Sequence, residues 1–266
     1  MAFRWIDLLY ALTPASRPPF LTVLRIFFLS TFVGTFLPSV GGDIYRAYSL
    51  ARHEVPLAES AASVLMDRML GVFSIALVGT LALIPTRDAE LHRGIAFVLI
   101  AAAATCAVAA VVVFSERAAT VVWRLTARVS PGRLHRAVVA LTDAVHRYSG
   151  HQAELLRVLV VSVLVQVIRI VQAWCLGRAL GLELPLVMYF ALIPLVLLVM
   201  LLPITVNGIG TSQWAFDRLF VPAGASPAQA FAVSVLFVAL GLVGNLPGGI
   251  LYAVGPPASV RERRAR

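Results

Sequence analysis

Residues 20–53 read FLTVLRIFFLSTFVGTFLPSVGGDIYRAYSLARH, and this stretch decides the fold class. It begins as an apolar run of near-membrane length, but Pro38, Gly41 and Gly42 interrupt it at the depth of the hydrocarbon core. The segment that follows, 44–53, is not apolar enough to cross a membrane alone. Broken backbone at that depth needs protein or a wet cavity to satisfy its polar groups. We therefore expect residues 20–53 to form a re-entrant helical hairpin.

A second stretch, residues 186–220, repeats this design. Its apolar run ends in LPITVNGIG, and the short segment TSQWAFDRLF follows. Asn and Gly both tolerate the left-handed backbone that a sharp break requires. We expect a second re-entrant hairpin here. Two Pro- and Gly-interrupted segments at corresponding positions of two halves are the pattern of transporters with inverted repeats.

The remaining apolar runs are continuous. A spanning helix needs about 20 apolar residues, and four runs are long enough: 61–84, 94–114, 155–180, and 228–254, which the sequence GNLPGG interrupts near its end. The whole chain of 266 residues is 60% hydrophobic and 13% charged, with a mean hydropathy of +0.89. These values lie outside the range of soluble domains. The predicted fold class is all-α, a polytopic integral membrane helical bundle with the two hairpins in an inverted-repeat arrangement.

Arginines set the expected topology. Residues 115–154 contain six arginines and the tail RERRAR contains four, so the positive-inside rule predicts that both are cytoplasmic. Agreement requires the first hairpin to enter from the cytoplasm, which keeps Arg4, Arg17, Arg46 and Arg52 on that side, and the second to enter from outside. We expect one membrane domain over 1–266, in the inner or cytoplasmic membrane. Its parts are a first half 20–114, a connector 115–154, a second half 155–254 and a tail 255–266.

The connector has the pattern of two amphipathic helices separated by Ser130-Pro131-Gly132. An apolar stripe runs along the second helix: Leu134, Val138, Leu141, Val145 and Tyr148. Two arrangements fit this pattern. The helices either lie on an anionic leaflet, as basic amphipathic helices do, or form a solvated helical hairpin that packs on the bundle.

The first break supplies candidate ligand residues. A half-helix that starts inside the membrane directs its N–H groups at the interior, where they attract anions. Gly41 and Gly42 allow a ligand to approach the backbone, and Arg46 can hold a phosphate through two hydrogen bonds. Asp43 would complement the helix dipole or pair with an arginine. The alternative is a structural kink with a capping aspartate and no ligand.

The second break offers a matching set. Asn207, Gly208 and Gly210 precede a half-helix that bears Gln213. By the same argument as at the first break, these four residues are candidates for binding a substrate.

Ionisable groups within spans are further candidates, because each costs about 2.5–3.5 kcal/mol on insertion scales. One face of the helix 155–180 carries Ser162, Gln166, Arg169 and Gln172, which predicts a polar stripe toward protein or a cavity. Asp67 is the expected counter-charge of Arg169 or Arg46. The alternative is a buried ion pair that only fixes helix packing. Two other arginines, Arg25 and Arg68, are expected to extend toward the membrane surface.

Enzyme motifs are absent from the sequence. The five histidines lie outside the spans, and no HExxH, paired metal ligands or nucleophile with a companion base is present. Cys106 and Cys175 lie within apolar runs, without disulfide or zinc spacing. We therefore expect no catalytic residue, no metal and no cofactor. The net charge of +9 is explained by orientation, so nucleic acid is not an expected partner.

Residues 36–72 carry a resemblance to a known family. They read FLPSVGGDIYRAYSLARHEVPLAESAASVLMDRMLGV. This segment resembles the part of the lysylphosphatidylglycerol synthase transmembrane family, also called flippase-like, that reads Pro-x-x-Gly-Gly-Asp-x-x-Arg-Ala and then Asp-Arg-x-x-Gly. The closing GNLPGGILYAV looks like its second conserved region, so the resemblance covers about 4–252. By position it implies functional roles for six residues: Gly41, Gly42, Asp43, Arg46, Asp67 and Arg68.

The resemblance also implies limits. Members of the family occur alone or fused to an aminoacyl-transferase domain that makes aminoacylated phosphatidylglycerol, and no such domain is expected in this chain. The family tends to read Gly-Gly-x-Gly-x-x-Glu at the second break, whereas this chain reads NGIGTSQ over 207–213. Loss of that acid argues against proton coupling or recognition of a cationic headgroup at Gln213.

Three functions follow as hypotheses. The first is a translocase (flippase) for an anionic or polyprenyl-linked lipid, with membrane lipids as its partners. The second is a non-transporting membrane partner of a lipid-modifying enzyme or glycosyltransferase, alone or as a homo-oligomer. The third is an intramembrane lipid transferase, which would have to use Asp43, Asp67 and arginines alone.

Overall fold

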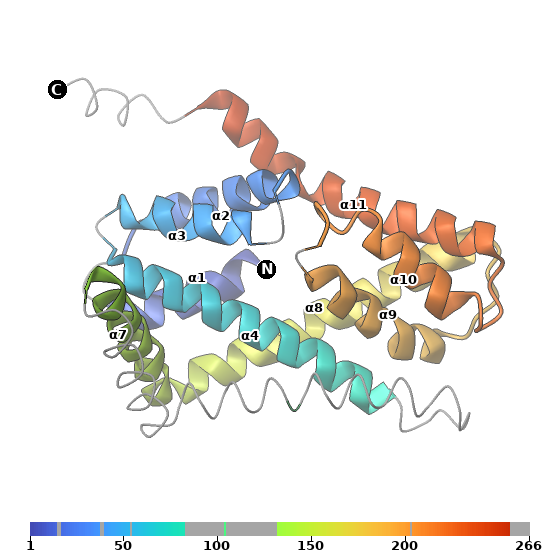
Figure 1. Ribbon diagram of the computed structural model, residues 1–266, viewed down its shortest axis with the longest axis horizontal. Helices are drawn as coiled ribbons and strands as arrows, with labels where there is room; N and C mark the ends of the chain where they lie inside the picture. Colours follow the sequence, from blue (N-terminus) through green and yellow to red (C-terminus); the bar gives the residue numbers. More distant parts are fainter. Residues whose placement is uncertain are drawn as a thin grey trace.

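The computed structural model describes residues 1–14, 17–37, 40–53, 55–82, 104, 132–202 and 204–255. Within these residues the regular structure is entirely helical, as the sequence predicts. The helices, in chain order, are α1 (Ala2–Leu12), α2 (Phe20–Thr35), α3 (Gly41–Ala51), α4 (Leu57–Ala82), α7 (Arg133–His146), the 3-10 turn η1 (Arg147–Gly150), α8 (Gln152–Ala179), α9 (Leu186–Leu201), α10 (Thr211–Phe220) and α11 (Pro227–Val254). Figure 1 shows their arrangement.

Three of these helices are long and apolar enough to cross a membrane: α4, α8 and α11. They coincide, within a few residues, with the expected spans 61–84, 155–180 and 228–254. Apart from residue 104, the expected span 94–114 lies outside the described residues, as does the first helix of the connector. The apolar helices α2 and α9 have 16 residues each, so at about 1.5 Å per residue each is about 24 Å long. This is shorter than the roughly 30 Å hydrocarbon core.

The interruption expected at GNLPGG is a bend and not an end. Helix α11 continues through Pro247 to Val254. Proline lacks an N–H, so the carbonyl of Val243 loses its helical partner and the helix bends at this point. In Figure 1 the last turns of α11 lean away from the direction of its first part. The GNLPGG sequence therefore marks a kink, and the helix continues beyond it to Val254.

The two broken runs form two helical pairs. Helix α3 folds back on α2, and α10 folds back on α9. Tyr189 in the first turn of α9 and Phe220 at the end of α10 bring their ring centroids within 5.2 Å, so the second pair returns to the side where it began. Gln229 donates a hydrogen bond to the Leu180 carbonyl at 3.3 Å, which joins the neighbouring ends of α11 and α8. In Figure 1 the breaks of both pairs face the middle of the molecule.

Glycine sets the spacing of the first pair. A Cβ placed on Gly42 would lie 2.7 Å from the carbonyl oxygen of Ser30 and 3.1 Å from the Cα of Gly34. Real Cβ atoms do not approach a backbone this closely, so α3 can begin against α2 only with glycine at this position. The Gly-Gly sequence is therefore a packing requirement of the fold, in addition to any role toward a ligand.

The helices bury three apolar clusters. The largest lies in the second half, where Phe216 and Leu192 of the second pair pack against Ile75 of α4 and Ile170 of α8. A second cluster surrounds Trp5 between α1, α2 and α3. The third joins α1, α4, α7 and the start of α8. Helix α4 contributes to all three clusters, so it connects the two helical pairs.

Helix α7, the second helix of the connector, packs on the bundle. Val145 and Tyr148 are buried against α1 and α4, and the Tyr148 hydroxyl donates to the Leu8 carbonyl at 2.9 Å. Burial raises the pKa of this phenol, which keeps the proton that the hydrogen bond uses. Arg147 also pairs with Glu59 at 2.7 Å. Of the two alternatives for the connector, packing on the bundle therefore applies to this helix.

We expect Gly248→Ala to destabilise the protein. A Cβ on Gly248 would overlap the carbonyl oxygen of Phe28 and lie 2.7 Å from the Cβ of Phe32, so α11 would have to move away from α2. Overpacking of this kind costs about 1–3 kcal/mol. The measurement is the thermal unfolding of the purified protein in detergent.

The matched control is Gly244→Ala, one turn earlier on the same helix, where a Cβ meets nothing within 4 Å. It should unfold at the same or a higher temperature, because alanine favours a helix over glycine by about 1 kcal/mol. Equal losses from both variants would show that the contact between α11 and α2 is not tight.

Candidate functional site

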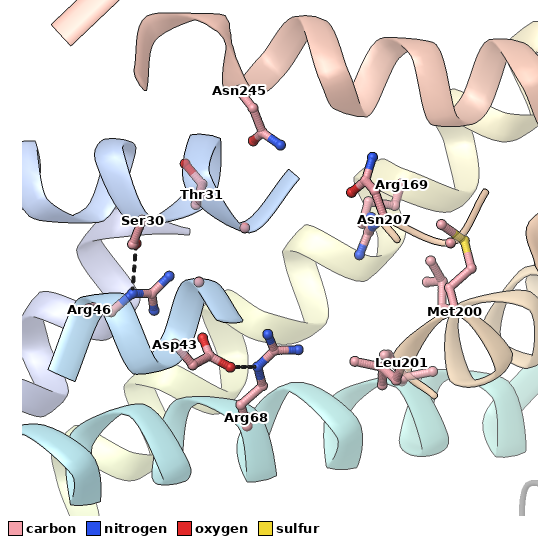
Figure 2. Close-up of a pocket in the computed structure, with 15 residues that line it drawn as sticks. Ser30, Thr31, Asp43, Arg46, Arg68, Arg169, Met200, Leu201, Asn207 and Asn245 are labelled. Carbon is pink, nitrogen blue, oxygen red and sulfur yellow. Dashed lines mark hydrogen bonds and ion pairs between the residues drawn. The ribbon is translucent and has the colours of Figure 1, made fainter. Parts of the chain in front are cut away.

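The two helix breaks meet in one central cavity. Its volume is about 280 Å³, and residues of α2, α3, α4, α8, α9, α11 and the loop before α10 line it. Figure 2 shows polar side chains from both halves of the chain around this space. Segments separated by more than a hundred residues in sequence thus contribute to a single site.

Seven of the eleven sequence-predicted site residues line this cavity: Gly42, Asp43, Arg46, Arg68, Arg169, Asn207 and Gly208. The other four lie outside its lining. Asp67 is buried behind it, next to Arg46. Gly41 packs toward the side chain of Leu37, and Gly210 and Gln213 hold the start of α10.

A buried ion cluster lies behind the cavity. Asp67 of α4 accepts from Arg4 of α1 at 2.6 Å and lies 3.8 Å from Arg46 of α3. All three side chains are at most 11% exposed. Arg4 also donates to Ser162 of α8 at 3.1 Å. The cluster therefore joins four helices, and the expected partner Arg46 is confirmed while Arg169 is not a partner of Asp67.

Arg4 has a structural role that the sequence did not indicate. We expected it only to mark the cytoplasmic side, but its side chain is buried, where it pairs with Asp67. The sequence signal that could have found it is the isolated basic residue within the apolar face of an amphipathic helix, FRWIDLL over 3–9. Its partner, 63 residues away, has no local signal.

Aromatic rings surround the Arg46 guanidinium. Its central carbon lies 4.8 Å from the ring of Trp5 and 4.7 Å from the ring of Phe27. The guanidinium also donates to the Ser30 hydroxyl at 3.1 Å. Cation–π contacts in a desolvated site are worth about 2 kcal/mol, which helps to offset the cost of burying this charge. Arg46 is therefore held in a fixed position at the cavity wall.

Asp43 and Arg68 form a second ion pair, at 2.6 Å. Asp43 lies in the first turn of α3, so it complements the helix dipole and pairs with an arginine at the same time. Arg68 was expected to extend to the membrane surface. It turns toward the cavity because the carboxylate of Asp43 is there, as Figure 2 shows.

Arg25 also departs from the sequence expectation. It was expected to extend toward the membrane surface, but its guanidinium donates to the carbonyls of Leu251, at 3.5 Å, and Gly255 at the end of α11. The last carbonyls of a helix have no helical partner, and an arginine satisfies them. Arg25 therefore fastens α2 to the end of α11.

Arg169 has no acidic partner among the described residues. Its guanidinium carbon lies 5.9 Å from the centre of the Phe237 ring. The polar stripe predicted on α8 is present: Ser162 accepts from Arg4, and Gln166 donates to Ser74 of α4 at 3.3 Å. Arg169 is the member of the stripe that lines the cavity, and Asn207 of the loop before α10 lines it too (Figure 2).

Left-handed backbone forms the second break. Asn207, Gly208 and Gly210 have φ values of 52°, 76° and 93°. The Gln213 side-chain oxygen accepts from the Gly210 N–H at 2.6 Å and from the Ser212 hydroxyl at 3.0 Å. Gln213 therefore caps its own helix, as a residue three positions into a capping box does. This use of the side chain explains why Gln213 lies outside the cavity lining.

Sequence reasoning missed three polar residues of the lining: Ser30, Thr31 and Asn245. Asn245 donates to the Thr35 hydroxyl at 3.0 Å, which joins α11 to α2. The signal for Asn245 was available, because it is the one amide in the apolar run 230–254. The two hydroxyl residues had no such signal, since Ser and Thr occur often in membrane helices and satisfy themselves on their own backbone.

The site carries excess positive charge. Four arginines (Arg4, Arg46, Arg68 and Arg169) accompany two aspartates (Asp43 and Asp67), which leaves two net positive charges. Each aspartate is already paired. Such a site can attract and hold an anion. No group of three or more His, Cys, Asp and Glu side chains gathers in the part of the chain that the structure describes.

Comparison with known families bears on this arrangement. The family model of the lysylphosphatidylglycerol synthase TM region matches residues 1–248. The chain belongs to this family. Membership confirms the resemblance seen in residues 36–72 and, together with the apolar helices α4, α8 and α11, places the chain in a membrane with a lipid-related role. No curated protein and no solved structure matches the chain.

We expect Asp67→Asn to destabilise the protein strongly. The amide still accepts a hydrogen bond from Arg4 but leaves Arg4 and Arg46 buried without a counter-charge. Removing one partner of a buried ion cluster costs about 3–5 kcal/mol. Folded yield and thermal unfolding in detergent are the measurements.

The control is Asp7→Asn. Asp7 lies 3.9 Å from Arg157, and both side chains are exposed, at 41% and 65%. An exposed pair of this kind contributes at most about 1 kcal/mol, so this variant should unfold close to the parent protein. An Asp67 variant as stable as the Asp7 variant would contradict the view that the buried cluster joins the helices.

Proposed function

We propose that this protein is a lipid translocase, which moves a lipid with an anionic or polyprenyl-linked headgroup across the cytoplasmic membrane. One observation carries the proposal: two broken helical pairs direct their breaks at a single cavity whose lining has an excess of arginine. The family's lipid-related role is consistent with it.

Helix ends strengthen the attraction for an anion. The first residues of α3 and the loop before α10 both reach the cavity, so the positive ends of two half-helix dipoles point toward it. Transporters place their substrate site at such interrupted helices, near the middle of the membrane. The chain would thus hold a headgroup at the point where it has to pass between leaflets.

The two pairs also suggest how the headgroup moves. We propose that α2–α3 enters the membrane from the cytoplasm and α9–α10 from outside, as an inverted repeat. Figure 1 supports this, since the two pairs point at each other from opposite ends of the molecule. Rocking of the two halves around a fixed site would then open the cavity to one leaflet at a time. No covalent step is part of the proposal, so the chain is not expected to act as an enzyme.

We expect Arg169→Ala to lower translocation at least tenfold. Arg169 is the cavity arginine without an acidic partner among the described residues, so it is free to bind a headgroup. A hydrogen bond to a charged group contributes about 1.5–3 kcal/mol, and about 1.4 kcal/mol is a factor of ten. The assay is reconstitution in liposomes with a leaflet-specific reporter for phosphatidylglycerol, aminoacyl lipids and polyprenyl-phosphate sugars.

Arg178→Ala is the matched control. Arg178 lies on the same helix, exposed at its end and about 13–14 Å further along at 1.5 Å per residue. This variant should translocate like the parent protein. Rates equal to those of empty liposomes for every lipid, with the unaltered chain, would contradict the translocase proposal.

The proposed topology is tested by single cysteines, in a background where Cys106 and Cys175 are replaced by alanine. Glu183→Cys and Pro222→Cys lie in exposed loops beside the second pair. Both should react with an impermeant thiol reagent from outside the cell. Gly132→Cys, in the connector, should react only after lysis.

These positions avoid strain. The neighbouring loop glycines Gly181 and Gly224 have φ values of 72° and 109°, at which cysteine is unfavourable. Labelling at Glu183 from outside but at Pro222 only after lysis would mean that the second pair crosses the membrane, and it would remove the inverted repeat.

A further inference from the structure

Arg169 offers the cavity an unused phosphate-binding group. A guanidinium presents five N–H donors in a planar fork that matches two phosphate oxygens. The other three arginines of the site already donate to Asp43 or Asp67 or lie beside them. Since Arg169 has no acid nearby within the described residues, a phosphate would meet its full charge.

Neutral acceptors and donors lie across the cavity from Arg169. Asn245 uses its amide N–H on Thr35, which leaves its side-chain oxygen to accept. The Thr31 hydroxyl donates to the Phe28 carbonyl, so its oxygen can also accept. Figure 2 shows Arg169 with Asn207 on one side and Thr31 with Asn245 on the other. Hydroxyl groups of a ligand can donate to such neutral acceptors.

Neither aspartate of the described site is left for an ammonium group. Asp43 is held by Arg68 at 2.6 Å, and Asp67 is held by Arg4 at 2.6 Å and approached by Arg46 at 3.8 Å. A positively charged headgroup would therefore meet the excess of guanidinium groups without a compensating acid. Like charges in a partly desolvated site repel strongly, so the site disfavours an aminoacyl ester.

Size restricts the headgroup further. A cavity of about 280 Å³ corresponds to roughly nine water molecules at about 30 Å³ each. It lies just below the 300–1,000 Å³ range of pockets for drug-sized ligands. A phosphate with a glycerol or a single sugar fits this volume.

We infer that the cavity selects a headgroup in which a phosphate carries a small, uncharged, hydroxyl-rich group, either glycerol or one sugar. The phosphate binds Arg169 and Asn207, and the hydroxyl groups bind Asn245 and Thr31. This inference rests on the proposed function only for the step of transport. The selection itself is a property of binding, and two lipid sources share the chemistry: phosphatidylglycerol and a polyprenyl phosphate that carries one sugar.

The test is native mass spectrometry of the full chain in detergent with defined lipids. Four are supplied in equimolar pairs: phosphatidylglycerol, a polyprenyl phosphate with one glucose, phosphatidic acid and lysyl-phosphatidylglycerol. At least one of the first two should bind about tenfold or more above lysyl-phosphatidylglycerol and severalfold above phosphatidic acid, whose headgroup is a phosphate without an alcohol hydroxyl group. The comparison of the first two identifies the source.

Two variants separate the halves of the site. Arg169→Gln should weaken binding of every phosphate lipid by about tenfold, from the loss of a charge-assisted contact. The double variant Thr31→Val with Asn245→Ala should leave phosphatidic acid binding unchanged and reduce the preference for the hydroxylated lipid to about one. Unchanged phosphatidic acid binding also shows that the double variant is folded.

Equal or stronger binding of lysyl-phosphatidylglycerol would overturn the inference, as would equal binding of phosphatidic acid and both hydroxylated lipids by the unaltered chain. Selective binding without movement in liposomes would instead support this inference and overturn the translocase proposal. The two failures are therefore distinguishable.

Discussion

A buried carboxylate is the constraint on which the rest of the structure depends. Asp67 lies between helices, where an ionised group is stable only with partners, and it draws Arg4 and Arg46 to itself. Those two arginines belong to α1 and α3, and Arg4 extends the connection to Ser162 of α8. Of the cavity arginines, Arg46 is thereby held against Asp67, whereas Arg169 has no acidic partner among the described residues. Pairing of Asp67 thus contributes both to the packing of the first half and to the net charge around the cavity.

Close backbone contact between helices is the second determinant of the structure. It is possible where glycine, which has no side chain, stands at the crossing. Gly42 lets α3 start against Ser30 and Gly34 of α2, and Gly248 lets α11 cross α2 at the carbonyl of Phe28. Small residues at helix crossings are the usual way in which membrane helices pack, since lipid supplies little hydrophobic drive between them. Here the crossings also bring Thr31 and Asn245 to the same cavity wall. Glycine placement therefore serves the site as well as the fold.

Much of this was predictable from the sequence, for identifiable reasons. The spans α4, α8 and α11 follow from run length, and both breaks follow from proline, glycine and asparagine within apolar runs, because these signals are local.

The side-chain partners were not predictable to the same extent. Asp67 was assigned to Arg169 or Arg46, whereas Arg4, which lies 63 residues away in sequence, makes the shorter contact. Gln213 was taken as a ligand residue but caps its own helix. Pro247 was taken as an interruption, although α11 continues through the one missing hydrogen bond to Val254. Burial and long-range pairing decide such cases, and neither has a local pattern.

Pro247 has a mechanical consequence. Helix α11 packs against α2 of the first pair and against α10 of the second, so this single helix contacts both halves. Arg25 clamps its far end through Leu251 and Gly255. The proposed rotation of one half against the other would therefore require α11 to bend. The turn between Val243 and Pro247 lacks a hydrogen bond and has the lowest bending stiffness. Asn245 lies within that turn, so bending of α11 at this point would move a side chain that lines the cavity.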